Sequence, residues 1–314
     1  MRYLFGGVNN MTDPRSFPVV KGAMADQVCA DNFDISKRLA GRRRLGRTQV
    51  SGLTAAAHSG WGDGQQAYFV QNSALKRVIA GASITAATIK TFTSNARACF
   101  CPVNNVVLCS NGVEIGIIDS GVWYALAEPT RTFKRALSPA HHLCFYRGRV
   151  YGAFGDVLTV SDPYSAETED VRLSKIPVPG NIGMLMDVDG GIWLSTAREI
   201  IFLSGTGPED FTYNVKANFP AIPYAYTSDR ADRMGLEFPG KVAAFGTTQG
   251  ICLGASDGTL LNLSTGKVSY NHGPSGAVMV RERDGNVFAV LSTGATEAAN
   301  NHYAAKDIAL TTTN

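Results

Sequence analysis

The stretch "CFYRGRVYGAFGDVLTVSDP", Cys144 to Pro163, decides the fold class of this chain. Its short runs of alternating side chains are interrupted at Arg147–Gly148 and again at Gly155–Asp156. Alternation with a period of two is typical of strands, and glycine adopts the positive φ that a tight hairpin needs. Asp162–Pro163 ends the pairing, because proline has no N–H to donate. The stretch therefore predicts three short strands in an antiparallel meander.

The same plan recurs along the chain. Residues 105–126, "NVVLCSNGVEIGIIDSGVWYAL", predict strands around a type I′ turn at Asn111–Gly112 and a second turn at Ser120–Gly121. Further meanders are predicted from Gln66, from Met184, between Lys241 and Tyr270, and around Asp284–Gly285. About five such meanders, each of roughly 25–45 residues, predict an all-β, β-propeller-like fold of roughly five to seven blades. A β-sandwich or an irregular barrel is the alternative architecture.

Composition supports this fold class and suggests two regions. The chain has 314 residues, with 45% apolar and only 18% charged side chains and 33 glycines, which suits a β protein with many turns. Residues 1–50 are turn-rich and are predicted to form an N-terminal arm with the first strands. Residues 51–314 are predicted to form the propeller-like domain.

Two long connections interrupt the predicted blades, at residues 162–183 and 205–240. Loops of this length in a compact domain are usually functional or pack on a partner. The second contains four prolines and six aromatic residues and is predicted to be an interface loop. Its candidate subunit contacts are Phe211, Tyr213, Phe219, Tyr224 and Tyr226.

The net charge of +3 comes from one segment. Residues 37–47, "KRLAGRRRLGR", hold six basic side chains and no acidic one, while the other 303 residues hold 23 basic and 26 acidic side chains. Such a cluster suits phosphates or an acidic protein surface. A solvated strand or a contact with a neighbouring subunit is favoured over the binding of phosphates. The candidate residues for either contact are Arg42, Arg43, Arg44 and Arg47.

Targeting signals and cysteine spacing point to a protein that folds in a cytoplasm. "MRYLFGGVNN" lacks the apolar core of a signal peptide, and no run of about 18 apolar residues predicts a membrane span. The six cysteines show no disulfide spacing, so reduced thiols are expected.

Three enzyme hypotheses fail on the pattern around their residues. "GASDG", Gly254 to Gly258, matches the G-x-S-x-G motif of serine hydrolases, but a predicted strand follows it where that motif needs a helix. Cys99, Cys101, Cys109 and His141–His142 lack the second short-spaced ligand pair of a structural zinc site.

A glycosidase is the third hypothesis. Its candidate acids, Glu167, Glu169 and Asp170, lie in one predicted loop, and nothing pairs them across a sugar. "DRADR", Asp229 to Arg233, supplies arginines for a carboxylate but reads equally as a solvated loop. We therefore predict that the chain is not an enzyme and uses no cofactor or metal.

Several stretches, in this order, resemble the propeller-type tail proteins of tailed bacteriophages, especially the nozzle proteins of the tail tubular B type. They are "GGVNN" at 6–10, "ADNFDISKRLAGRRRLGRTQ" at 30–49, "YRGRVYGAFGDVLTVSDP" at 146–163, "GGIWLSTAREIIFLSGTGPEDF" at 190–211 and "TTQGICLGASDGTLLNLS" at 247–264. Together they span most of the chain.

The resemblance implies a structural role in a virion tail that is assembled in the cytoplasm of a bacterial host. It implies a homo-oligomeric ring, commonly six-fold, around the DNA ejection channel below the portal and adaptor, with other tail proteins as neighbours. DNA would touch this ring only in transit, and a near-neutral channel wall would let it slide. Large nozzle proteins carry extra domains that 314 residues do not hold, so another ring or tip component stays open.

The alternative function is a propeller-type tail module that binds a glycan or a host receptor. It predicts an aromatic-lined pocket at the blade tops, built from residues such as Trp61, Trp123 or Trp193.

Overall fold

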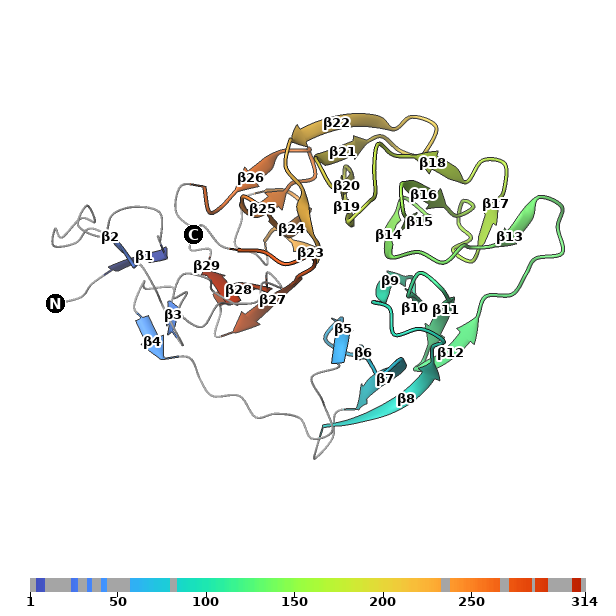
Figure 1. Cartoon of the computed structure of the whole chain (residues 1–314), viewed down its shortest axis with the longest axis horizontal. Coiled ribbons are helices and arrows are strands. Elements are labelled where there is room, and N and C mark those ends of the chain that lie inside the picture. Colours follow the sequence, from blue (N-terminus) through green and yellow to red (C-terminus); the bar gives the residue numbers. More distant parts are fainter. Residues whose placement is uncertain are drawn as a thin grey trace. The chain divides into compact units, whose positions relative to one another are not determined.

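The structure is a computed structural model of the whole chain. It describes residues 4–8, 24–27, 33–35, 41–43, 57–79, 84–232, 238–265, 271–283, 286–292 and 307–311, with side chains in 57–79, 84–232, 238–265, 271–279 and 291–292. Throughout this part the chain forms strands and turns, and the prediction of a β-propeller is confirmed (Figure 1).

The propeller blades are four-stranded antiparallel sheets, and the described part of the chain contains five of them. The first two are β5–β8 (Ala57–Gly62, Ala67–Gln71, Ala74–Ile79, Thr85–Thr91) and β9–β12 (Cys99–Val103, Val106–Ser110, Ile115–Asp119, Val122–Ala125). The third combines β14, β15, β16 and β18 (His142–Tyr146, Arg149–Phe154, Val157–Val160, Lys175–Pro177).

The fourth and fifth blades follow later in the chain. They are β19–β22 (Met184–Val188, Gly191–Ser195, Ile200–Ser204, Thr212–Ala217) and β23–β26 (Ala221–Arg230, Lys241–Thr247, Gly250–Gly254, Leu260–Asn262). A three-stranded sheet, β27–β29 (Ala277–Arg283, Asn286–Ser292, Asp307–Thr311), comes after them.

Three two-stranded sheets complete the described structure. The first is a parallel pair, β1 and β2 (Leu4–Val8, Met24–Gln27), and the second is β3 and β4 (Phe33–Ile35, Gly41–Arg43). The third joins β13 (Lys134–Ala136) to β17 (Thr168–Asp170) in antiparallel register.

The quoted stretch folds as its sequence predicts. β14, β15 and β16 pair in order, with Tyr146 opposite Arg149 and Phe154 opposite Val157. Arg147 and Gly148 both have positive φ, at 45° and 76°, which gives the tight turn between the first two strands. Asp162 lies beyond β16, so the meander ends where the proline was expected to end it.

One predicted turn is wrong. Asn111–Gly112 is not a two-residue type I′ turn, because four residues, 111–114, connect β10 to β11. The Asn111 side-chain oxygen accepts hydrogen bonds from the backbone N–H groups of Val113 and Glu114, at 3.0 and 2.8 Å. This local hydrogen bonding lets asparagine build a wider turn instead. Ser120–Gly121 is a tight turn, with φ of 50° and 83°.

The chain divides into two compact units, each with its own packed core. Unit 2 comprises residues 47–185 and 207–209. Its core includes one cluster around Tyr68, Val70 and Leu75, with Trp61 and Trp123 packed against it, and a second around Leu108 and Val150.

Unit 1 comprises residues 1–46, 186–206 and 210–314. Its inner strands β20 and β25 are buried at every position, since packing layers cover both faces. Trp193 is fully buried there, with ring centroids 4.9 Å from Phe202 and 6.2 Å from Phe245. The predicted boundary at residue 50 lies outside the described residues.

Candidate functional site

The β13/β17 pair with its flanking loops, which we call the strap (residues 128–138 and 162–175), is the main candidate site in unit 2. β13 comes from the connection between β12 and β14, and β17 from the connection between β16 and β18. Lys134 lies opposite Asp170, and Arg135 opposite Glu169. The strap therefore places cationic and anionic side chains directly across a short antiparallel pair, outside the four-stranded sheets.

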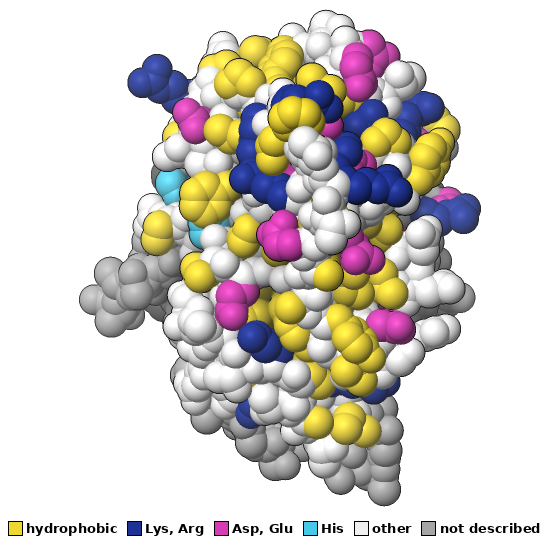
Figure 2. Space-filling view, turned by 90° about the vertical axis from the view of Figure 1, so that its right-hand side faces the viewer, with side chains coloured by type: hydrophobic (Ala, Val, Ile, Leu, Met, Phe, Trp, Pro, Cys, Tyr) yellow, Lys and Arg dark blue, Asp and Glu magenta, His cyan; other side chains and the backbone are white. Residues whose placement is uncertain are grey.

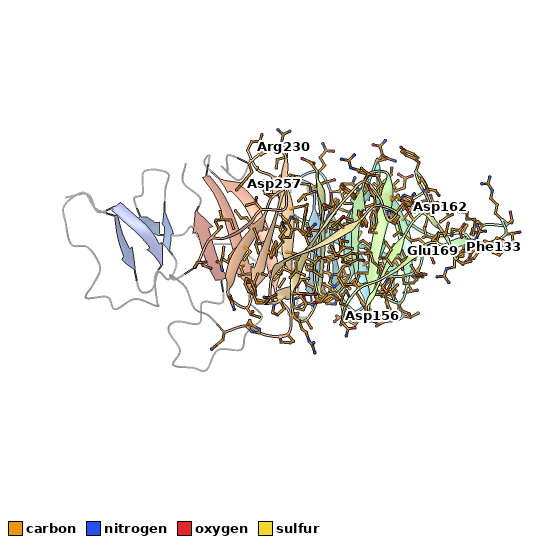
Figure 3. All side chains as sticks on the ribbon, turned by 90° about the horizontal axis from the view of Figure 1, so that it is seen from above. Phe133, Asp156, Asp162, Glu169, Arg230 and Asp257 are labelled. Atoms are coloured by element: carbon orange, nitrogen blue, oxygen red, sulfur yellow. The ribbon has the colours of Figure 1, made fainter. Side chains whose placement is uncertain are left out.

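Carboxylates are buried inside the strap and cations cover them. Glu169 is fully buried and accepts hydrogen bonds from the Arg135 guanidinium and, at 3.0 Å, from the Ser138 hydroxyl. The Lys175 ammonium lies 3.6 Å from the same carboxylate. In Figure 3, Phe133 lies at the outer end of the strap and Glu169 lies further inward. These contacts compensate the desolvation of Glu169.

A second ion-pair group centres on Asp170 and Asp162. Arg172 binds both oxygens of Asp170 in a fork, at 3.0 and 2.9 Å. Lys134 Nζ lies 2.6 Å from Asp162 and 3.3 Å from Asp170. Hydrogen bonds from Arg172, assisted by Lys134, hold the pKa of Asp170 well below its usual range. Hydrogen bonds to Asp162 and, more weakly, to Asp170 raise the pKa of Lys134. The Asp170 carboxylate is therefore charged at neutral pH.

The outer surface of the strap exposes apolar and cationic side chains. Phe133 is 52% exposed and Leu173 is 76% exposed. The Arg172 guanidinium lies 4.3 Å from the centre of the Phe133 ring, a cation–π contact. In the view of Figure 2, Lys and Arg side chains gather around hydrophobic ones in the upper half of the face. Exposed aromatic and arginine side chains are typical of binding surfaces.

A surface hollow of about 530 Å³ lies beside the strap. Arg131, Lys134, Asp162, Ser165 and Thr168 are among the residues that line it. The Thr168 hydroxyl donates to Asp162 at 3.0 Å and shares a 2.8 Å hydrogen bond with the Ser165 hydroxyl. The hollow thus presents several fixed polar groups in one place, as ligand sites do.

The prediction that residues 205–240 form one long loop is wrong, because the segment contains two strands, β22 and β23. Its role as a subunit interface stays a prediction. The long connection at 162–183 likewise contains β17 and β18. Of the five aromatic candidates, Tyr213 is the most accessible at 40% exposure and lies in β22, the last strand of its sheet. The other four are half-buried: Phe211, Phe219, Tyr224 and Tyr226.

The arginine candidates fall mostly beyond what the structure describes. Arg42 and Arg43 lie in β4, paired with Asp34 and Phe33, without described side chains. Arg44 and Arg47 lie outside the described residues. Their contact with DNA or with a subunit stays a prediction.

For Trp193 the expected aromatic pocket is wrong. Trp193 is fully buried, and its indole N–H donates to the Ala255 carbonyl at 3.1 Å. Trp61 stacks on Tyr68 and on Phe100, with ring centroids 6.0 Å apart in each pair, and Tyr68 and Phe100 stack on each other at 6.3 Å. Trp123 meets Phe92 edge to face at 5.5 Å. Trp193 therefore belongs to the core, and Trp61 and Trp123 are half-buried and pack against the core of unit 2.

The serine and cysteine candidates have structural contacts. Ser256, in "GASDG", donates its hydroxyl to the Lys241 carbonyl at 2.7 Å, and the motif turns from β25 into β26, a strand as predicted. The Cys99 thiol donates to the carbonyls of Ser110 and Ala140, and burial raises its pKa to about 12. Among the described residues, no three metal-binding side chains cluster.

The remaining charged candidates differ in their contacts. Arg230 in "DRADR" makes a fork to Asp232, at 3.0 and 2.8 Å, and both side chains are largely exposed. Glu167 is exposed on the strap, whereas Glu169 and Asp170 are buried in the pairs described above. The sequence analysis did not predict the strap, because β13 and β17 lie in segments about 34 residues apart. The length of the 162–183 connection was the one feature of the sequence that pointed to a functional segment there.

Comparisons with known proteins show similarity in fold alone. No protein-family model matches the chain, and no curated protein matches it. Among solved structures, the extracellular domain of a one-component system from B. thetaiotaomicron has a TM-score of 0.51 and 12% identity, over 77% of this chain and 32% of that one. This chain thus spans about a third of that protein's length.

Two further structures match at lower TM-scores. The WD40 β-propeller domain of Doa1 has a TM-score of 0.44 and 10% identity, over 78% of this chain and 79% of that one. The N-terminal domain of Nup159 has a TM-score of 0.48 and 10% identity, over 75% and 72%. Within the described residues, no helix has the length and hydropathy to cross a membrane.

Proposed function

We propose that this chain is a structural subunit of a phage virion tail, a nozzle-like ring component around the DNA ejection channel. The observation that carries the proposal is the apolar surface of β22, the last strand of its sheet, where Tyr213 is 40% and Val215 is 52% exposed. An edge strand with exposed apolar side chains is suited to contact with another subunit.

A second last strand, in unit 2, has the same character. Val122 and Tyr124 in β12 are 50% and 55% exposed. The resemblance to tail nozzle proteins over most of the chain supports the same function, and a β-propeller is the fold that it implies. The partners in this proposal are copies of the chain, the portal and adaptor, other tail proteins, and DNA in transit.

Light scattering on the purified protein, followed by negative-stain imaging, tests the proposal. A six-fold ring would have a mass of about 201 kDa, six times 33.5 kDa. Tyr213→Glu with Val215→Glu should reduce the oligomer to smaller species, because buried unpaired charge is costly at an interface. Val113→Glu is the matched control, since Val113 is 54% exposed in the turn between β10 and β11. A protein that stays monomeric at every concentration, with no ring in the images, contradicts the proposal.

A tail module that binds a glycan or a host receptor is the second candidate function. One observation favours it: the polar hollow beside the strap, with exposed aromatic residues next to its lining in sequence.

A further inference from the structure

The strap hollow has a fixed hydrogen-bonding wall. Asp162 is held by Lys134 Nζ at 2.6 Å on one oxygen and by the Thr168 hydroxyl at 3.0 Å on the other, and Ser165 bonds to Thr168 at 2.8 Å. A carboxylate oxygen accepts more than one hydrogen bond, and a hydroxyl both donates and accepts. The wall is therefore preorganised for a ligand that carries several hydroxyl groups.

Arg131 adds a cation that the fold does not use. It is exposed at the hollow, and its guanidinium makes no ion pair or hydrogen bond with any described side chain. The other cations of the strap all have carboxylate partners: Lys134, Arg135, Arg172 and Lys175. A guanidinium matches a carboxylate with two parallel N–H···O bonds. This arginine therefore selects a ligand with a negative planar group.

Two exposed aromatic residues adjoin the lining residues in sequence. Phe133 precedes Lys134, and Tyr164 lies between Pro163 and Ser165; they are 52% and 93% exposed. Both have left-handed backbone conformations, with φ of 63° and 57°. A side chain with a Cβ is strained there and glycine is not. Strained exposed aromatics with no core to fill are characteristic of ligand sites.

The charge distribution separates the ligand classes. Exposed Glu128 and Glu167 and the Asp162 carboxylate lie among the cations of the strap. A nucleic-acid backbone needs a continuous row of unpaired cations, which this arrangement lacks. One unpaired guanidinium, a hydroxyl-binding wall and an aromatic ring together suit a single acidic sugar unit.

We propose that the strap hollow binds an oligosaccharide that carries carboxylate groups. Arg131 pairs with the sugar carboxylate, Asp162, Ser165 and Thr168 bind its hydroxyls, and Phe133 stacks on the apolar face of a ring. The proposal deepens the second candidate function and rests on it. It does not depend on ring assembly.

Titration calorimetry with three acidic probes tests it: oligosaccharides of glucuronate, of galacturonate, and sialyllactose, with cellotetraose as the neutral control. At least one acidic probe should bind the full-length protein, and the neutral one at least ten-fold more weakly. Arg131→Gln should weaken binding at least ten-fold. Arg198→Gln, at an exposed arginine in unit 1, should leave binding unchanged.

A second variant separates binding from folding. Phe133→Gly relieves the left-handed strain, so its urea midpoint should stay the same or rise while binding weakens at least five-fold. Absence of binding by all three acidic probes overturns the proposal, as does equal binding of cellotetraose or an unchanged affinity in Arg131→Gln. Binding of polyglutamate as tight as that of the best sugar would assign the site to an acidic peptide and overturn it too. Light scattering on the same samples reports ring assembly independently.

Discussion

Acidification from pH 7.5 to pH 5 should destabilise the protein through one buried side chain, His142. It begins β14 and is only 2% exposed. Burial lowers the pKa of its imidazole to about 3, and neighbouring His141 contributes in the same direction. An imidazole in the unfolded chain has a pKa of about 6.5. Between these two values the unfolded chain binds a proton that the folded protein excludes, so stability falls as the pH falls.

The magnitude follows from these two pKa values. At pH 5 the unfolded imidazole is almost fully protonated and the folded one almost fully neutral, which lowers the free energy of unfolding by about 2 kcal/mol relative to pH 7.5. The loss grows until the pH reaches the folded pKa. Carboxylates with lowered pKa values, such as Asp170, add their own loss only near and below about pH 4. The pH 5 measurement therefore isolates the histidine.

Urea unfolding followed by tryptophan fluorescence at pH 7.5 and pH 5 measures the effect. His142→Gln keeps a hydrogen-bonding side chain but does not titrate, so its stability should change by less than about 0.5 kcal/mol between the two pH values. His141→Gln is the comparison: it removes the neighbour that adds to the effect of burial on His142, so this variant should keep most of the wild-type loss at pH 5. If wild type and His142→Gln lose the same stability at pH 5, the reasoning is refuted.

Two further substitutions test the packing of each unit. Glu169→Gln should lower the free energy of unfolding by roughly 2–4 kcal/mol, because it leaves the cationic partners of a fully buried carboxylate uncompensated. Its control is Glu167→Gln, at the exposed residue just before β17, which should lower the free energy of unfolding by less than about 0.5 kcal/mol in the same urea titration. Gly254→Ala should cost roughly 1–3 kcal/mol, since its Cβ would lie 2.5 Å from the buried Trp193 ring. Gly60→Ala, where a Cβ meets nothing within 4 Å, is its control, and equal urea midpoints for the two alanine variants would contradict this account of the core.

Much of the blade pattern could be predicted from the sequence because it depends on local chemistry. Glycine next to a polar residue sets the hairpins at Arg147–Gly148 and Ser120–Gly121, and the strands around them alternate with a period of two. The prediction of a two-residue turn failed at Asn111–Gly112. There the Asn111 side chain accepts backbone hydrogen bonds and stabilises a four-residue connection instead.

The candidate site depended on contacts between distant segments. The sequences of β13 and β17 do not predict strands. The two segments form a strand pair, with Lys134 opposite Asp170, only where the fold brings them together. The exposure of Phe133 and Tyr164 likewise depends on the tertiary position of the strap. Neither their residue type nor their spacing in the sequence predicts that they are exposed.

The amino-acid sequence alone predicted most of the strand succession and favoured a β-propeller over a β-sandwich or an irregular barrel, because turn residues and two-residue alternation act over a few neighbouring positions. Tertiary structure alone decided which aromatics fill the core, as Trp193 does, and which face solvent, as Phe133 does. It also decided that Glu169 and Asp170 form buried ion pairs rather than lying in a loop. Burial and charge compensation are properties of neighbours in space, and spacing along the chain does not fix those neighbours.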